Sequence, residues 1–140
     1  MNADIPVLNI LARGEAGNYI GGSGMGTARI FINDVPQNVL FPHIVVEQFD
    51  AEAFDTKDGV AYVDHELIKV YCYGEGNTGV RDSKILARAA RNTLDSYQHT
   101  TIGGEEVEYI RYLRQSDYNI SLTNKKVYVR EQDYQVRIKN

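Results

Sequence analysis

A single long helical pattern lies between two groups of strand patterns, and this order constrains the fold more than any other feature. Apolar residues recur at helical spacing along residues 80–97, namely Ile85, Leu86, Ala89, Ala90, Leu94 and Tyr97. Segments rich in β-branched and aromatic residues stand on both sides, at 29–34, 43–49 and 61–73 before the helix and at 107–122 and 125–138 after it. Turn signals rather than further helices join these segments, which indicates antiparallel hairpins.

We therefore expect an α+β fold, in which one long helix packs across an antiparallel β-sheet. Residues 5–13 are apolar on one side and predict a short helix or turn near the N-terminus. Residues 99–106 are interpreted as a turn because they contain Gly103 and Gly104. A length of 140 residues fits one domain spanning 1–140.

The stretch Gly74-Glu75-Gly76-Asn77-Thr78-Gly79 fits the spacing G-x-G-x-x-G between a strand and a helix. A dinucleotide site built on that motif needs a parallel βαβ unit and an acidic residue at the end of the next strand. The hairpins predicted here do not supply that setting, and Glu75 would repel a pyrophosphate. We interpret these glycines as a sharp turn that leads the strand into the helix. A second glycine-rich stretch, Gly21–Gly26, leads into a strand rather than a helix, and its role stays open.

The side chains that carry chemistry do not form a recognisable catalytic or metal-binding pattern. Cys72 is the single cysteine, so the chain has neither an internal disulfide nor a cysteine-based zinc site, which is typical of a reducing compartment such as the cytoplasm. A catalytic cysteine–histidine pair would require His43 or His99 to approach Cys72 in space. The N-terminus shows no secretory signal pattern. We expect no enzyme activity, no cofactor and no membrane association.

Charge is distributed unevenly along the chain. Residues 1–70 hold 10 acidic and 4 basic side chains, whereas residues 71–140 hold 9 acidic and 11 basic ones. Asp50, Glu52, Asp55 and Asp58 fall on the hairpin predicted between the two strands before the helix, and we expect this acidic hairpin to project. Its oxygens are of the kind that Mg²⁺ or Ca²⁺ binds, but the spacing matches no known loop, and a solvated tip is the simpler interpretation.

A second charged feature is the basic face, which consists of Arg81, Lys84, Arg88 and Arg91 on the predicted helix. A solvated amphipathic surface is the simplest interpretation of this face. Contact with an acidic patch of another subunit is the second, and contact with nucleic-acid phosphate is the third. The overall charge of −4 disfavours a dedicated nucleic-acid binder.

Taken together, three stretches resemble the tail terminator, or tail-completion, proteins of long-tailed bacteriophages, which include tail-to-head joining proteins. The stretches are RIFINDVPQNVLFPHIVVEQF, AYVDHELIKVYCYGE and the helix SKILARAARNTLD, and the resemblance covers about residues 5–97. It implies a non-enzymatic virion protein that forms a hexameric ring at the head-proximal end of the tail tube. Such a ring ends tube polymerisation, joins the head connector or neck protein, and lets genomic DNA pass through its lumen without specific binding. Assembly of the ring can depend on Mg²⁺.

Two alternatives remain beside this expectation. Another neck or tail-tube ring protein of the same virion would share the fold pattern but use an open rather than a closed interface. A small nucleotide-binding or DNA-binding module would use Gly74–Gly79 or the basic face.

Overall fold

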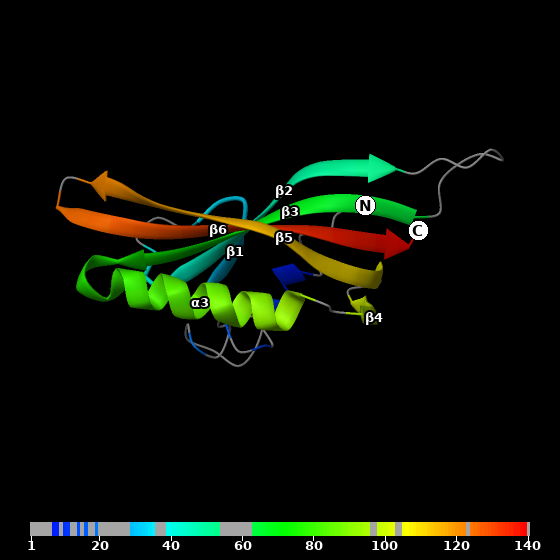
Figure 1. Cartoon of the computed structure of the whole chain (residues 1–140), viewed down its shortest axis with the longest axis horizontal. Coiled ribbons are helices and arrows are strands. Elements are labelled where there is room, and N and C mark those ends of the chain that lie inside the picture. Colours follow the sequence, from blue (N-terminus) through cyan, green and yellow to red (C-terminus); the bar gives the residue numbers. More distant parts are fainter. Residues whose placement is uncertain are drawn as a thin grey trace.

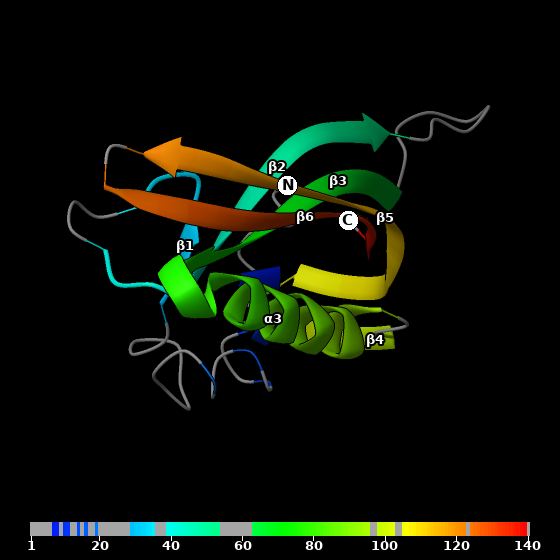
Figure 2. The same cartoon turned by 60° about the vertical axis from the view of Figure 1, so that its left-hand side comes forward.

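The computed structural model describes residues 29–35, 39–53, 63–95, 98–102, 105–122 and 124–139, together with 7–8, 10–11, 14, 16 and 19. Its elements follow in the order β1 (Ile30–Ile32), β2 (His43–Ala53), β3 (Val63–Glu75), a 3₁₀ turn (Gly76–Thr78), α3 (Gly79–Leu94), β4 (Gln98–Ile102), β5 (Glu105–Leu122) and β6 (Lys125–Lys139) (Figure 1). The predicted α+β fold is confirmed, with α3 lying along one face of the sheet (Figure 2).

The strands form one six-stranded sheet in the order β1-β2-β3-β6-β5-β4. The predicted hairpins β2–β3 and β5–β6 are both present and antiparallel.

Two predictions about the strands were wrong. The pair β1–β2 is parallel, with Ile30 opposite Ile44 and Ile32 opposite Val46, because the ten residues that separate the two strands are enough for β2 to run in the same direction as β1. Residues 98–102, mostly interpreted as part of a turn, form β4, in which β-branched Thr100, Thr101 and Ile102 pair with β5.

The helix packs its apolar side onto β3 and β6. Leu86, Ala89, Ala90 and Leu94 are buried as predicted, and the structure adds Ala87 to this set. Ile85 was wrongly placed in the core, because the stripe runs through residues 86, 90 and 94 and leaves Ile85 on the flank, 36% exposed. Tyr97 lies outside the described residues. The opposing sheet residues are Ile68, Val70, Cys72, Tyr134, Val136 and Ile138.

The described N-terminal residues pack into the same core. Val7, Leu8, Ile10 and Leu11 are helical, as the expected N-terminal helix requires. Val7, Ile10 and Leu11 are buried with the apolar side of α3. One face of the sheet is therefore covered by helical segments, and we call the opposite face the outer face.

The glycine turn between β3 and α3 is explained by close backbone packing. A Cβ on Gly74 would overlap the carbonyl oxygen of Gly79, and it would stand 2.9 Å from both the Cα and the carbonyl carbon of that residue. A Cβ on Gly79 would stand 2.6 Å from the Tyr128 ring, and Gly76 has a φ of +71°. All three glycines of the motif thus meet steric demands of the turn itself.

A buried carboxylate links the three central strands. The side chain of Asp133 on β6 is only 3% exposed and accepts ion pairs from Lys69 of β3, at 3.3 Å, and from Arg114 of β5. Lys69 also contacts Glu131 at 3.3 Å. Because a buried charge without partners is costly, this arrangement requires all three strands to hold one alignment.

Candidate assembly surfaces

The four residues of the basic face lie on the solvent side of α3, as predicted, and all four are exposed. Their partners divide them into two pairs. Arg81 approaches Asp82 at 3.8 Å, and Arg91 approaches Asp95 at 3.8 Å while its guanidinium stacks 3.8 Å from the Tyr112 ring centroid. Lys84 and Arg88 form no ion pair with any residue that the structure describes. These two cations are therefore the ones most available to an external acidic group.

A polar network lies beside the basic face, between α3 and the β5–β6 hairpin. The Tyr134 hydroxyl donates to Gln132 Oε1 at 2.7 Å, and Gln132 Nε2 donates to the Ala87 carbonyl at 2.9 Å and to Gln115 Oε1 at 3.0 Å. Gln115 in turn donates to Asp117, which also accepts from Arg130 at 2.7 Å. The network fixes the floor of a small hollow of about 220 Å³ that Lys84, Arg88 and Arg91 border. Sequence patterns missed Gln132, because a buried glutamine on a strand leaves no periodic signal.

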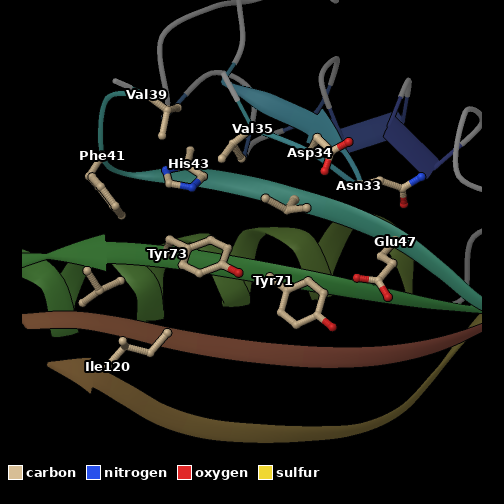
Figure 3. A pocket seen from close by; sticks show the side chains of 12 residues that line it. Asn33, Asp34, Val35, Val39, Phe41, His43, Glu47, Tyr71, Tyr73 and Ile120 are labelled. Atoms are coloured by element: carbon tan, nitrogen blue, oxygen red, sulfur yellow. The ribbon is translucent and has the colours of Figure 1, made fainter. Parts of the chain in front are cut away.

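The larger cavity lies on the outer face, and Figure 3 shows it from close by. Its volume is about 620 Å³, and we call it the outer-face pocket. Its apolar surface comes from Val35, Val39, Phe41, Val45, Tyr71, Tyr73, Ile120 and Val127. Several of these residues are unusually exposed for apolar side chains, including Val35 at 42% and Ile120 at 42%, and the neighbouring Leu40 is 68% exposed. An apolar surface of this kind is typical of a binding or assembly site.

His43 lies within the aromatic wall of the outer-face pocket. Its ring stacks on Tyr73 with centroids 4.8 Å apart and contacts Phe41 at 4.6 Å, and the side chain is 3% exposed. Nδ1 is buried without a hydrogen-bond partner in the described structure. Burial lowers the pKa of His43 to about 4, with the Leu40 backbone acting in the opposite direction, so the ring is neutral at pH 7.

Two carboxylates, Asp34 and Glu47, complete the pocket lining with Asn33. Neither carboxylate forms an ion pair with a residue that the structure describes. Burial is the main cause that raises the pKa of Tyr73 to about 12, and Tyr71 is shifted in the same direction by burial and then by Glu47. The lining of the pocket therefore combines an apolar aromatic floor with two carboxyl groups, and the cations Arg29 and Lys125 lie next to it.

The acidic hairpin can be placed only in part. Asp50 and Glu52 lie on β2, opposite Leu67 and His65 of β3, so the predicted hairpin carries them. Their side chains, and Asp55 and Asp58, lie outside the described residues, as does the loop Gly21–Gly26. Among the residues described, no group of three or more histidine, cysteine or acidic side chains is arranged to hold a metal ion.

His43 does not form the possible catalytic pair with Cys72. Cys72 pairs with Ile44 across β2–β3, and it faces the core while His43 faces the outer pocket. The side chain of His99 is outside the described residues. Burial raises the pKa of Cys72 to about 12. No helix of the described chain is long and apolar enough to cross a membrane.

Comparison with known proteins shows a likeness in fold but no match in sequence family. No protein-family model matches the sequence, and no curated protein matches it. Among solved structures, the chain is similar to a chain of a structure described as "Virion of native gene transfer agent (GTA) particle". The TM-score is 0.52 at 16% identity, and the alignment covers 79% of this chain and 78% of the other. At this identity the likeness shows a shared fold.

Proposed function

We propose that this protein is a virion structural protein that forms a hexameric ring at the head-proximal end of a phage tail tube. The observation that carries the proposal is the fold shared with a chain of a gene transfer agent virion, over nearly four fifths of each chain. The resemblance of residues 5–97 to tail terminator proteins, noted from the sequence, supports the same assignment. The ring ends tube polymerisation and joins the tube to the head connector or neck protein.

The described surfaces suit an assembly protein better than an enzyme. Lys84 and Arg88, which form no ion pair with the described residues, lie on the side of α3 that faces away from the sheet, and the apolar outer-face pocket lies on the other side of that sheet. Two distinct surfaces on one chain favour contacts in which each subunit uses both, as a ring requires. In this proposal the protein is not an enzyme, requires no cofactor, and resides in the virion after assembly in the host cytoplasm.

The acidic hairpin gives this ring a means of letting DNA pass. Asp50, Glu52, Asp55 and Asp58 facing the lumen would prevent adhesion of the DNA phosphates by like-charge repulsion. Replacing Asp55 and Asp58 by lysine should leave the ring intact and slow DNA passage. Unchanged infectivity of particles carrying this double variant would contradict the lumen assignment without affecting the ring proposal.

The ring itself is tested by light scattering of the purified chain over a wide concentration range, with and without Mg²⁺. A discrete species near six times the mass of one chain, seen as a ring by electron microscopy, is the expected result. Added to polymerising tube protein, this species should shorten the tubes. A chain that remains monomeric under every condition and leaves tube length unchanged would contradict the proposal.

The second candidate is a neck or tail-tube ring protein of the same virion. The same two surfaces would build such a protein if the rotation between neighbouring subunits does not bring the last subunit back to the first, so that an open polymer forms instead of a closed ring. Open-ended polymers in the light-scattering experiment would support this candidate over the terminator.

A further inference from the structure

One edge of α3 carries exposed apolar side chains beside two cations, Lys84 and Arg88, that form no ion pair with the described residues. Val80, Lys84 and Arg88 follow one another at intervals of four residues, so they form a ridge along the helix. Val80 is 47% exposed, and the adjacent Ile85 is 36% exposed. We call Val80, Lys84, Ile85 and Arg88 the α3 ridge. It is exposed, partly apolar and positively charged, and its two cations border the small hollow described above.

The outer-face pocket has the opposite properties. It is concave, it holds about 620 Å³, and its floor is made of aromatic and aliphatic side chains. The carboxylates of Asp34 and Glu47 lie on its lining without ion-pair partners among the described residues. His43 is neutral at pH 7 and adds no positive charge to the lining. Two cations lie beside the pocket, and both have partners within the chain: Lys125 lies over the Phe41 ring and pairs with Glu75 at 3.6 Å, and Arg29 donates to the Pro42 carbonyl at 3.0 Å.

The two surfaces lie on opposite sides of the sheet, so one molecule cannot bring its own ridge to its own pocket. The α3 side of β3 presents Val70 and Cys72, whereas Tyr71 and Tyr73 project into the pocket from the other side of the same strand. Contact between ridge and pocket therefore requires a second copy. Each copy would then give a ridge to one neighbour and a pocket to the other.

We propose that the outer-face pocket receives the α3 ridge of a second copy of this chain, with Arg88 contacting Glu47 and Lys84 contacting Asp34 of the neighbour. This inference rests on the proposed ring and names the surfaces that build it. Val80 and Ile85 cover the apolar floor of the pocket, and the aliphatic stems of the two basic side chains lie along Tyr71 and Tyr73. Burying the two charge pairs at this contact gives the interface its direction and register.

The test is a charge exchange between Arg88 and Glu47. R88E places a carboxylate against the carboxylates of the pocket, and E47R places a guanidinium against the cations of the ridge. We expect each single variant to raise the dissociation constant of the assembly about a hundredfold, because like charges are brought together. The double variant R88E/E47R reverses both members of the pair at every contact and should recover most of the wild-type mass in light scattering.

R111E serves as a matched control, because Arg111 is also exposed and lines neither surface. It should assemble like the wild type. Assembly of both single variants with unchanged mass would overturn the ridge-and-pocket contact while leaving the ring proposal standing. Two disrupted single variants without recovery in the double variant would also overturn it. Salt-sensitive binding of duplex DNA that R88E abolishes, with unchanged mass, would instead assign the ridge to nucleic acid.

Discussion

The turn between β3 and α3 allows a graded test of why the glycine motif exists. The change is alanine at Gly74, Gly76 or Gly79, each of which adds one methyl group at a different kind of position. At Gly74 the three nearest atoms all belong to the backbone of Gly79. At Gly79 the nearest atom is Cδ2 of Tyr128, a side chain, and at Gly76 nothing lies within 4 Å. Only the positive φ of Gly76 opposes its substitution.

The expected losses of unfolding free energy follow that order. Overpacking costs about 1–3 kcal/mol, and Gly74→Ala should reach about 3 kcal/mol, because backbone must move to relieve the overlap. Gly79→Ala should cost about 2 kcal/mol, since the Tyr128 ring can yield part of the space. Gly76→Ala should cost about 1 kcal/mol, the strain of a left-handed conformation in a residue with a Cβ.

Urea denaturation followed by circular dichroism measures the three values on one scale. Gly76→Asn is the control for the conformational contribution, because asparagine tolerates a positive φ, and it should be close to wild type. The steric account would be refuted if Gly76→Ala were the most damaging change, or if Gly74→Ala had no measurable effect. A nucleotide that raised the melting temperature of the wild type would show that the loop also binds a ligand.

Three further predictions test the interior. The folded pKa of His43 is about 4 against an ordinary 6.5, so the unfolded state takes up the proton first as the pH falls. About 3 kcal/mol of stability, present above pH 6.5, should therefore be lost as the pH falls to 4, and denaturation of His43→Phe should depend less on pH. Cys72, whose pKa burial raises, should resist iodoacetamide at pH 8 until denaturant is added; rapid labelling of the native protein would contradict its burial. Tyr134→Phe should cost about 1–3 kcal/mol in urea denaturation, because Gln132 Oε1 loses its donor, whereas Tyr118→Phe at an exposed site should cost almost nothing.

The helix and the hairpins, which have strong local sequence patterns, could be predicted from the sequence. The parallel pairing of β1 with β2 and the short strand β4 could not. The hairpins β2–β3 and β5–β6 follow from alternating β-branched residues with turns between them, and α3 follows from its apolar stripe. The parallel pairing of β1 with β2 carries no local signal, because the same three residues could pair in either direction. The short strand β4 was missed, because the adjacent Gly103 and Gly104 favoured interpreting the whole stretch 99–106 as a turn.

The candidate surfaces likewise differ in how far the sequence predicts them. The basic face is a property of one helix, and its exposure could be predicted from helical spacing alone. The outer-face pocket joins Asp34, Tyr73 and Val127, which become neighbours only through the strand order β1-β2-β3-β6. Bulges add to the difficulty, since the interruption between Tyr112 and Arg114 shifts the alternation of side chains along β5.

The triad of Lys69, Asp133 and Arg114 has a consequence for how the β5–β6 hairpin avoids mispairing. From Leu113 to Ser121 every residue of β5 is exposed, so burial gives this half of the strand little preference for one alignment. A slip of one residue between β5 and β6 would turn Arg114 away and leave the Asp133 carboxylate with a single cation in a nearly dry position. The triad thus disfavours shifted registers during folding. It makes the nearest wrong alignments of β5 and β6 electrostatically costly where hydrophobic burial cannot distinguish them from the correct one.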